Sequence, residues 1–313
     1  MSMKNGFSTL ACPAWTLDRV LDTAVELGFD GIELRFIESD DRLWQRPEFT
    51  GSGLRQTRQR LRDAGMPVCC VDTSCFFHHP EGGLRQASLE MGRGMIELAA
   101  ELGAPGIRVF GDRVQPGADR AETVKWIAEG VRTLASHGGP YGVETWLETH
   151  GDFARAADTK EILQAAGAEN TGAIWDPLNS YSEFGEDPAA GLAVWLGNLR
   201  RVDNPPEPPA NRPAGAGCQP ARRIPSCPTT NGIVLPGLRH AHIKDARQAG
   251  SLWEPVLMGT GDFPAARVVD LLRQHDYRGF VSFEWEKRWH AQIPEPEVAL
   301  PHFMQWMRAA LEA

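Results

Sequence analysis

The chain has 313 residues and a formal net charge of −9, from 32 Lys and Arg against 41 Asp and Glu. Its hydrophobic content of 42% and charged content of 23% are ordinary for a globular protein and exclude a disordered chain. The acidic balance also argues against binding through the phosphate backbone of a nucleic acid, which needs clustered Lys and Arg.

The N-terminal segment MSMKNGFSTLACPAW has one lysine and lacks the apolar run of a signal peptide. No apolar run in the sequence reaches the roughly 18 residues that a membrane helix needs. The six cysteines form no CxxC pair, so their spacing indicates neither a zinc ribbon nor a disulfide framework. We therefore expect a reduced, cytoplasmic protein.

Short apolar segments alternate with longer amphipathic segments along the chain. This pattern predicts strands at 6–12, 31–35, 67–73, 106–110, 141–148, 172–176, 238–243 and 279–285. It predicts helices at 16–28, 52–65, 84–103, 118–137, 154–166, 187–200, 264–275 and 295–312. Thr16 is a candidate N-cap of the first helix, and glycines at 28, 65 and 103 are expected to end the first three helices.

About eight strand–helix pairs of this kind predict a (β/α)8 TIM barrel that forms a single domain over residues 1–313. An open, doubly wound sheet is the alternative. Such a sheet would normally carry a glycine-rich phosphate loop after its first strand, where this chain reads ACPAWT. The Pro- and Gly-rich segment 203–236, before strand seven, is predicted to be an insertion that is either a disordered loop or an ordered lid.

Side chains of the metal-ligand type follow one another at the ends of the last four predicted strands. Strand five ends in LETH and strand six in WDPLN, whereas strand seven contains HAHIKD and strand eight SFEWEK. The active site of a βα barrel lies at the C-terminal ends of its strands, so we expect these groups to converge. One such residue alone is ordinarily a solvated or ion-paired loop residue. Three carboxylates and an imidazole together suit a divalent ion, with Mn2+ expected first and Mg2+, Co2+ or Zn2+ as alternatives.

The segments GFDGIELR, LETHGDF, WDPLN, HAHIKDA, GTGDFP and GFVSFEWEK occur in this order along nearly the whole chain outside 203–236. As a set they resemble the sugar phosphate isomerase/epimerase family, also called the xylose-isomerase-like TIM-barrel superfamily. The resemblance implies that the metal ligands are Glu148, Asp176, His242 and Glu284. His242 is preferred to His240 because the family's motif reads H-x-K-D. Glu284 is preferred to Glu286 because the family's ligand usually follows an S-x pair.

The resemblance also implies a reaction. A metal that bridges two oxygens of a hydroxy-ketone stabilises an enediolate, and two carboxylates then remove and return a proton. In this family Glu148 and Glu284 would be that acid/base pair. The function expected is therefore a divalent-metal-dependent sugar isomerase or epimerase. If the adjacent carbon carries a leaving group, the same proton removal gives elimination, so a lyase or dehydratase acting on a keto-sugar, keto-glycoside or inosose is the alternative.

Five further residues are expected to contact the substrate: His150, Lys244, Trp15, Glu33 and His78. Each also has an ordinary structural role open to it. Lys244 can pair with Asp245 instead of a substrate oxygen. Glu33 can form an internal salt bridge with Arg35. Trp15 can be a core residue, although indole faces also stack on the C–H surfaces of sugars.

Two other classes of protein on this fold are less well supported. AP endonucleases of this type carry further histidines after the Asp residues of strands six and seven, where this chain has Asn179 and Arg247. The net charge of −9 also disfavours a nuclease. A non-catalytic metal- or sugar-binding barrel would not need both Glu148 and Glu284. The expected partner is a small-molecule sugar or polyol rather than a nucleic acid or a membrane, and assembly into a homo-oligomer is left open.

Overall fold

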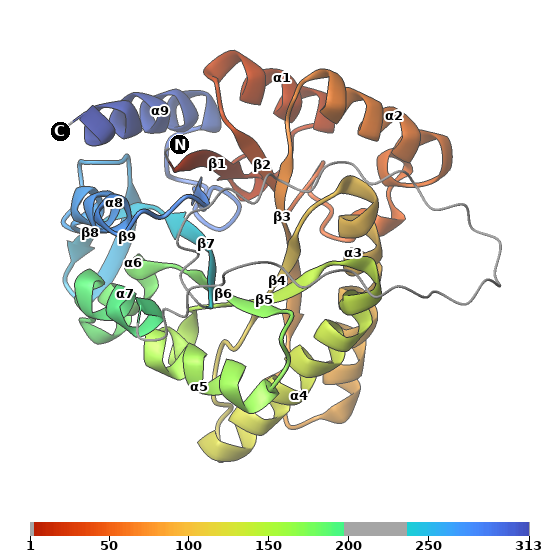
Figure 1. The fold of residues 1–313 in the computed structure, drawn as a ribbon. Helices are drawn as coiled ribbons and strands as arrows, with labels where there is room; N and C mark the ends of the chain where they lie inside the picture. Colours follow the sequence, from red (N-terminus) through yellow and green to blue (C-terminus); the bar gives the residue numbers. More distant parts are fainter. Residues whose placement is uncertain (1–2, 197–236, 313) are drawn as a thin grey trace.

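The structure is a computed structural model that describes residues 3–196 and 237–312. Parallel strands form a closed barrel with helices around it, which confirms the predicted single-domain TIM barrel (Figure 1). Around the barrel lie β1 (Lys4–Ser8), β2 (Gly31–Leu34), β3 (Val68–Phe76), β4 (Gly106–Phe110), β5 (Glu144–Glu148), β6 (Thr171–Trp175), β7 (Leu238–Ile243) and β10 (Phe280–Phe283). The predicted insertion at 203–236 lies outside the described residues.

The helices of the outer layer are α1 (Leu17–Leu27), α2 (Gly51–Asp63), α3 (Gly82–Leu102), α4 (Arg120–Gly138), α5 (Ala156–Ala166), α6 (Pro177–Phe184), α7 (Pro188–Leu196), α8 (Ala265–Gln274) and α9 (Pro296–Glu312). Short 3-10 turns are η1 (Thr9–Ala11), η2 (Leu43–Gln45), η3 (Pro47–Phe49), η4 (Gly139–Tyr141) and η5 (Gly151–Phe153). Thr16 caps α1 as predicted, since its hydroxyl accepts the N–H of Arg19 at 3.3 Å. The helix predicted at 187–200 is described as far as Leu196, and its remainder lies outside the described residues.

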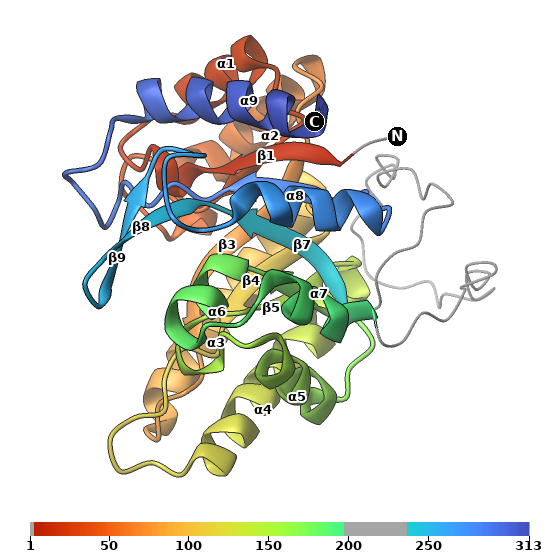
Figure 2. The same ribbon diagram turned by 90° about the vertical axis from the view of Figure 1, so that its left-hand side faces the viewer.

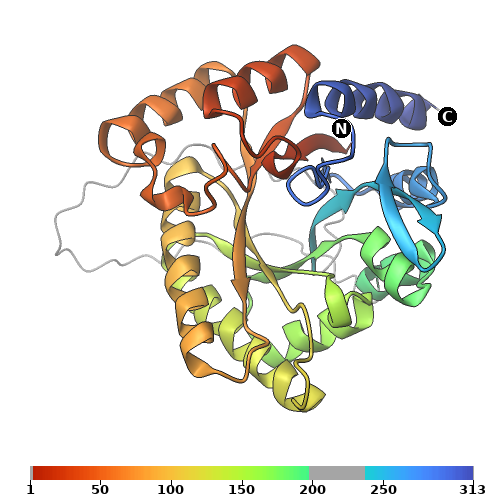
Figure 3. The same cartoon turned by 180° about the vertical axis from the view of Figure 1, so that it is seen from behind.

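The barrel closes where its first and last strands pair. Lys4 of β1 lies opposite Phe280 of β10, and the parallel register continues to Phe7 opposite Phe283. This pairing brings α1 and α9 side by side (Figures 1 and 3). Phe303 of α9 stacks on Phe283 with ring centroids 4.6 Å apart, so the main core lies between the strands and the helices.

The inside of the barrel is apolar at one level and charged at the next. A separate buried cluster consists of Cys70, Trp146 and Ile174. The Trp146 indole donates a hydrogen bond to Glu144 at 2.8 Å, and its ring lies nearly parallel to that of His240, with centroids 6.0 Å apart. Residues two apart on a strand face the same side, so Glu148 lies on the same face as Trp146, nearer the C-terminal end of β5. Trp146 thus forms an apolar floor below the charged groups.

Two elements lie outside the sequence prediction. Helix α6 starts at Pro177, directly after its N-cap Asp176, which is a recognisable start signal for a helix of only eight residues. The second is an antiparallel hairpin of β8 (Asp245–Ala249) and β9 (Leu252–Val256), which follows β7 at its C-terminal end (Figure 2). Its two-residue turn begins at Gly250, where φ is 67°. The hairpin is largely exposed, so it lacks the apolar pattern by which the other strands were predicted.

The described cysteines agree with the prediction of a protein without disulfides in this part of the chain. Cys12, Cys69, Cys70 and Cys75 are all free and buried. Within residues 3–196 and 237–312, no helix combines the length and apolar character that a membrane span requires.

Helix α4 approaches the barrel closely at Gly130, where a Cβ would lie 2.2 Å from the ring of the buried Phe77. We expect Gly130→Ala to lower the free energy of unfolding by about 1–3 kcal/mol, because the overpacked ring must move. Urea denaturation measures this loss. Gly83→Ala in α3 is the control, since no atom lies within 4 Å of its Cβ position. The same stability in both variants would contradict this account of the packing.

Candidate functional site

Four side chains converge at the C-terminal end of the barrel, as the sequence analysis expected. They come from β5, the end of β6, β7 and the end of β10, and are Glu148, Asp176, His242 and Glu284. One ligand atom of each lies within 4.8 Å of one atom of every other, and all four side chains are buried. We call these residues the four-residue cluster.

The start of helix α6 sets the orientation of Asp176. Its Oδ1 accepts the backbone N–H groups of Leu178 at 3.0 Å and Asn179 at 3.1 Å. Its Oδ2 lies 2.9 Å from Nζ of Lys244 but outside hydrogen-bond geometry, and it has no hydrogen-bond partner among the described residues. One oxygen therefore caps the helix, and the other remains free for the cluster.

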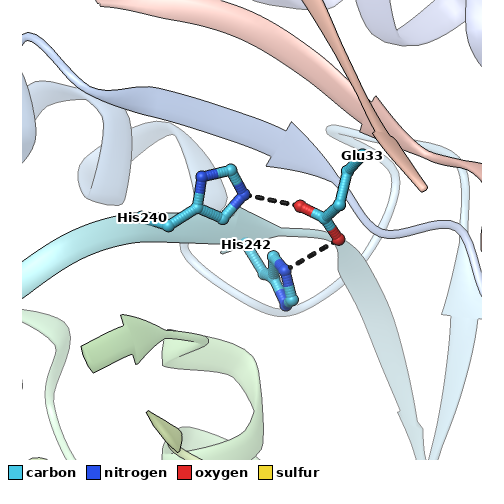
Figure 4. A group of neighbouring side chains, drawn as sticks. All are labelled: Glu33, His240 and His242. Atoms are coloured by element: carbon cyan, nitrogen blue, oxygen red, sulfur yellow. Dashed lines mark hydrogen bonds and ion pairs between the residues drawn. The ribbon is translucent and has the colours of Figure 1, made fainter. Parts of the chain in front are cut away.

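The two ring nitrogens of His242 face different carboxylates. Nδ1 lies 3.2 Å from Oε1 of Glu148 and 3.4 Å from Oε1 of Glu284. Nε2 lies 3.1 Å from Oε1 of Glu33, and the other oxygen of Glu33 lies 2.6 Å from Nε2 of His240 (Figure 4). Glu33 was predicted to contact substrate, but the structure places it against the two histidines, and it is not among the described residues that line the pocket.

Two cations balance the carboxylates. Arg108 of β4 donates a hydrogen bond to Oε2 of Glu148 at 2.6 Å, and its Nε lies 3.4 Å from Asp72. Lys244 lies one residue beyond β7 and donates to Oε2 of Glu284 at 2.7 Å and also to Glu286. Both side chains are buried, so their charges interact strongly with the acids beside them.

Burial and the neighbouring cations shift the pKa values of the two glutamates in opposite directions. Burial raises the pKa of Glu284 to about 7, against the opposing effect of Lys244 and His242. Burial acts on Glu148 in the same direction, but Arg108 and His242 hold the pKa of that carboxyl below its ordinary value. Three carboxylates and one imidazole in one buried place, with a free oxygen on Asp176, form a donor set that fits a divalent cation.

An open pocket gives access to the cluster. The residues predicted to form the site that do line it are Glu148, Glu284, His150 and Lys244. Nδ1 of His150 lies 3.1 Å from Oδ1 of Asp112, which holds the imidazole at the pocket wall. Asp245 does not pair with Lys244. It accepts the backbone N–H groups of Gly259 at 2.8 Å and Gly261 at 3.0 Å, which ties the loop after the hairpin to β8.

Two predicted substrate contacts are not among the described residues that line the pocket. Trp15 is buried in the main core, with the guanidinium of Arg19 lying 4.0 Å from its ring centroid. His78 is also buried, and its Nε2 lies 3.8 Å from Oδ2 of Asp112. Trp15 follows β1 and His78 follows β3 in the sequence, but both side chains are buried in the protein.

Arg108 and Trp289 are among the pocket residues that the sequence analysis missed. Arg108 is the charged residue in the otherwise apolar strand GIRVF, and a charge inside such a strand is a signal of the barrel interior. Trp289 lies in the segment between β10 and α9 and is 59% exposed at the pocket. No pattern in the sequence distinguished Trp289 from the other tryptophans.

A family model described as xylose isomerase-like TIM barrel matches residues 21–310. A comparison with curated proteins gives no significant match. The solved structure of L-ribulose 3-epimerase superposes with a TM-score of 0.70 at 15% identity, covering 99% of this chain and 95% of that chain. The 3-keto-D-glucoside 4-epimerase of E. coli gives a TM-score of 0.67 at 18% identity, covering 98% of this chain and 100% of that chain.

The probable 3-DHS dehydratase AsbF of Bacillus anthracis superposes equally well, with a TM-score of 0.69 at 16% identity, covering 98% of this chain and 99% of that chain. At these identities the solved structures show a common fold. The family model extends over most of the 313 residues. The chain therefore belongs to the xylose isomerase-like TIM barrel family.

Proposed function

We propose that this protein is a divalent-metal-dependent sugar isomerase or epimerase. The observation that carries the proposal is the four-residue cluster, two of whose carboxylates line an open pocket. Epimerases acting on L-ribulose and on a 3-keto-D-glucoside have the same fold, which supports the proposed substrate class. The proposed partner is accordingly a small sugar or polyol.

The ion would be held by Glu148, Asp176, His242 and Glu284. Hard oxygen donors with one imidazole favour Mn2+, with Mg2+, Co2+ or Zn2+ as alternatives. When bound, a divalent ion supplies positive charge that stabilises the enediolate of a hydroxy-ketone substrate. The protein contributes a buried, pre-formed set of ligands whose orientation is fixed by the α6 cap and by the cations Arg108 and Lys244.

In the proposed reaction Glu148 and Glu284 are the acid/base pair. They come from β5 and β10, which are separated in the barrel by β6 and β7, so they approach a bound substrate from different strands. Arg108 orients one oxygen of Glu148, and Lys244 orients one oxygen of Glu284. One carboxylate would take the proton from the hydroxyl-bearing carbon next to the substrate's carbonyl, and the other would return it.

Elimination is the second candidate reaction, and one feature of the pocket favours it. Lys244 and His150 both line the pocket beside the carboxylate pair, and each is able to give a proton to a departing group. A lyase or dehydratase acting on a keto-sugar, keto-glycoside or inosose would use the same cluster. The same fold in a probable dehydratase is compatible with this alternative.

Product analysis in D2O distinguishes the two reactions. The purified protein with Mn2+ is incubated with a panel of ketohexoses and with 3-keto-glycosides and inososes. We expect deuterium in the recovered sugar without loss of water or aglycone, because the removed proton exchanges with solvent before it is returned. Release of an aglycone or formation of a dehydrated product would replace the isomerase by the lyase.

Glu148→Gln and Glu284→Gln are each expected to lower kcat by about 10²- to 10⁴-fold, because each removes a proton-transfer group. The assay is deuterium exchange into the best substrate of the panel. Glu254→Gln, at an exposed position of the β8–β9 hairpin, is the matched control and should keep full activity. Full activity in both site variants would instead favour a non-catalytic binding barrel.

The exposed indole of Trp289 is proposed to stack on the C–H face of the sugar. Trp289→Ala is then expected to raise KM about two- to tenfold with little change in kcat, since an aromatic contact contributes about 0.5–1.5 kcal/mol. Trp289→Phe should restore most of the affinity. The control is Leu252→Ala, which removes a side chain that is also well exposed but lies outside the described pocket lining. An unchanged KM for Trp289→Ala would reject the stacking role.

A further inference from the structure

We infer that Glu33 and His240 act as positioning residues that direct the Nδ1 atom of His242 toward the metal. This pair, named here the Glu33–His240 clamp, rests on the proposed function, because it assumes that His242 is a ligand. The clamp reassigns Glu33, which the sequence analysis placed in contact with substrate. Glu33 contacts Nε2 of His242 (Figure 4). Glu148 and Glu284 lie against the other ring nitrogen, Nδ1.

The carboxylate of Glu33 bridges two imidazoles. One oxygen lies 2.6 Å from Nε2 of His240, and the other lies 3.1 Å from Nε2 of His242. An ionised carboxylate only accepts hydrogen bonds, so when Nδ1 of His242 holds a cation, the hydrogen of that imidazole stays on the nitrogen that faces Glu33. Oε1 of Glu33 and Nε2 of His242 have no hydrogen-bond partner among the described residues, and their contact at 3.1 Å is an ion pair outside hydrogen-bond geometry.

The hydrogen on Nε2 decides which atom of His242 is free to bind a cation. A neutral imidazole with Nε2–H has its lone pair on Nδ1. Nδ1 is the nitrogen that faces the carboxylates of the four-residue cluster, at 3.2 Å from Glu148 and 3.4 Å from Glu284. A carboxylate behind a ligating imidazole fixes both the tautomer and the ring orientation. The clamp therefore selects Nδ1 as the ligand atom.

Burial indicates that the clamp acts through His242 rather than on the substrate. Glu33 and His240 are both buried, and neither is among the described residues that line the pocket. His240 is itself held from below, because its ring lies 15° from parallel with that of Trp146 on the barrel floor. The floor, His240, Glu33 and His242 thus form a continuous series of contacts that ends at the cluster.

The same three residues have a competing interpretation as a second cation site. Glu33, His240 and His242 bring three ligand atoms within 4.8 Å of one another. The 2.6 Å distance between Glu33 and His240 is that of a direct hydrogen bond, which leaves no space for an ion between those two atoms. We therefore assign the group as a clamp, and the metal stoichiometry tests this assignment.

Metal binding is measured on the full chain by calorimetry with Mn2+ and by the visible absorption of bound Co2+. Glu33→Gln is expected to weaken Mn2+ binding about 10- to 100-fold and to change the Co2+ spectrum, because the tautomer of His242 is no longer fixed. Glu186→Gln is the matched control. Glu186 is a partly buried glutamate outside the clamp and the four-residue cluster that accepts the backbone N–H of Ala156 at 3.3 Å, and its loss should leave Mn2+ affinity unchanged.

A second pair of variants distinguishes loss of the clamp from loss of folding. His240→Gln keeps an N–H donor for Glu33 and should bind Mn2+ within a fewfold of the unchanged protein, whereas His240→Leu should show the loss seen in Glu33→Gln. Histidine 15N spectra of the protein loaded with diamagnetic Zn2+ give a second readout, in which His242 should carry hydrogen on Nε2 and bind through Nδ1. Loss of Nε2–H in Glu33→Gln would show the effect directly.

The outcomes separate the clamp from the proposed function. If the unchanged protein binds no divalent ion, the proposed function fails. If it binds one ion and is active, but Glu33→Gln and His240→Leu bind Mn2+ equally well, the clamp is overturned and the function stands. If it binds two ions per chain and Glu33→Gln removes one, the three residues are a metal site and the clamp is likewise overturned.

Discussion

The site is organised around one electrostatic constraint, which is the burial of three carboxylates at one end of a barrel. Glu148, Asp176 and Glu284 would repel one another there without compensation. Neighbouring cations and backbone N–H groups offset this repulsion. Arg108 donates a hydrogen bond to Glu148, Lys244 donates one to Glu284 and lies 2.9 Å from Asp176, and the first turn of α6 gives two N–H groups to Asp176. The cluster retains unsatisfied acceptor capacity, so its geometry suits a cation.

The fold and most of the site could be predicted from the sequence. In a closed parallel barrel the C-terminal ends of all strands lie at the same end of the barrel. Ligand-type residues at four strand ends must meet, whatever their separation in the chain. The direction of a side chain beyond the end of a strand depends on the conformation of the loop, which strand order does not predict. Trp15 follows β1 and turns into the core, whereas Trp289, well after β10, reaches the pocket. Arg108 could have been identified as a charge within an apolar strand.

The hairpin and α6 were harder to predict for physical reasons. The hairpin strands are exposed on the outside of the barrel end, so no core imposes an alternation of apolar residues on them. Helix α6 is short and depends on its cap more than on an apolar face. Both elements begin within two residues of a predicted site residue. The two elements that the apolar pattern did not predict therefore each directly follow a residue of the site, Asp176 or Lys244.

Closure of the barrel through β1 and β10 also governs the order in which the site can be completed. Residues 4–7 pair with residues 280–283, so β1 lacks one of its two neighbours until that later segment has been made. Glu284 directly follows that last strand and reaches the cluster only after closure. A nascent chain that stops before residue 284 therefore lacks one carboxylate of the four-residue cluster. Closure of the barrel and completion of the cluster are thereby linked.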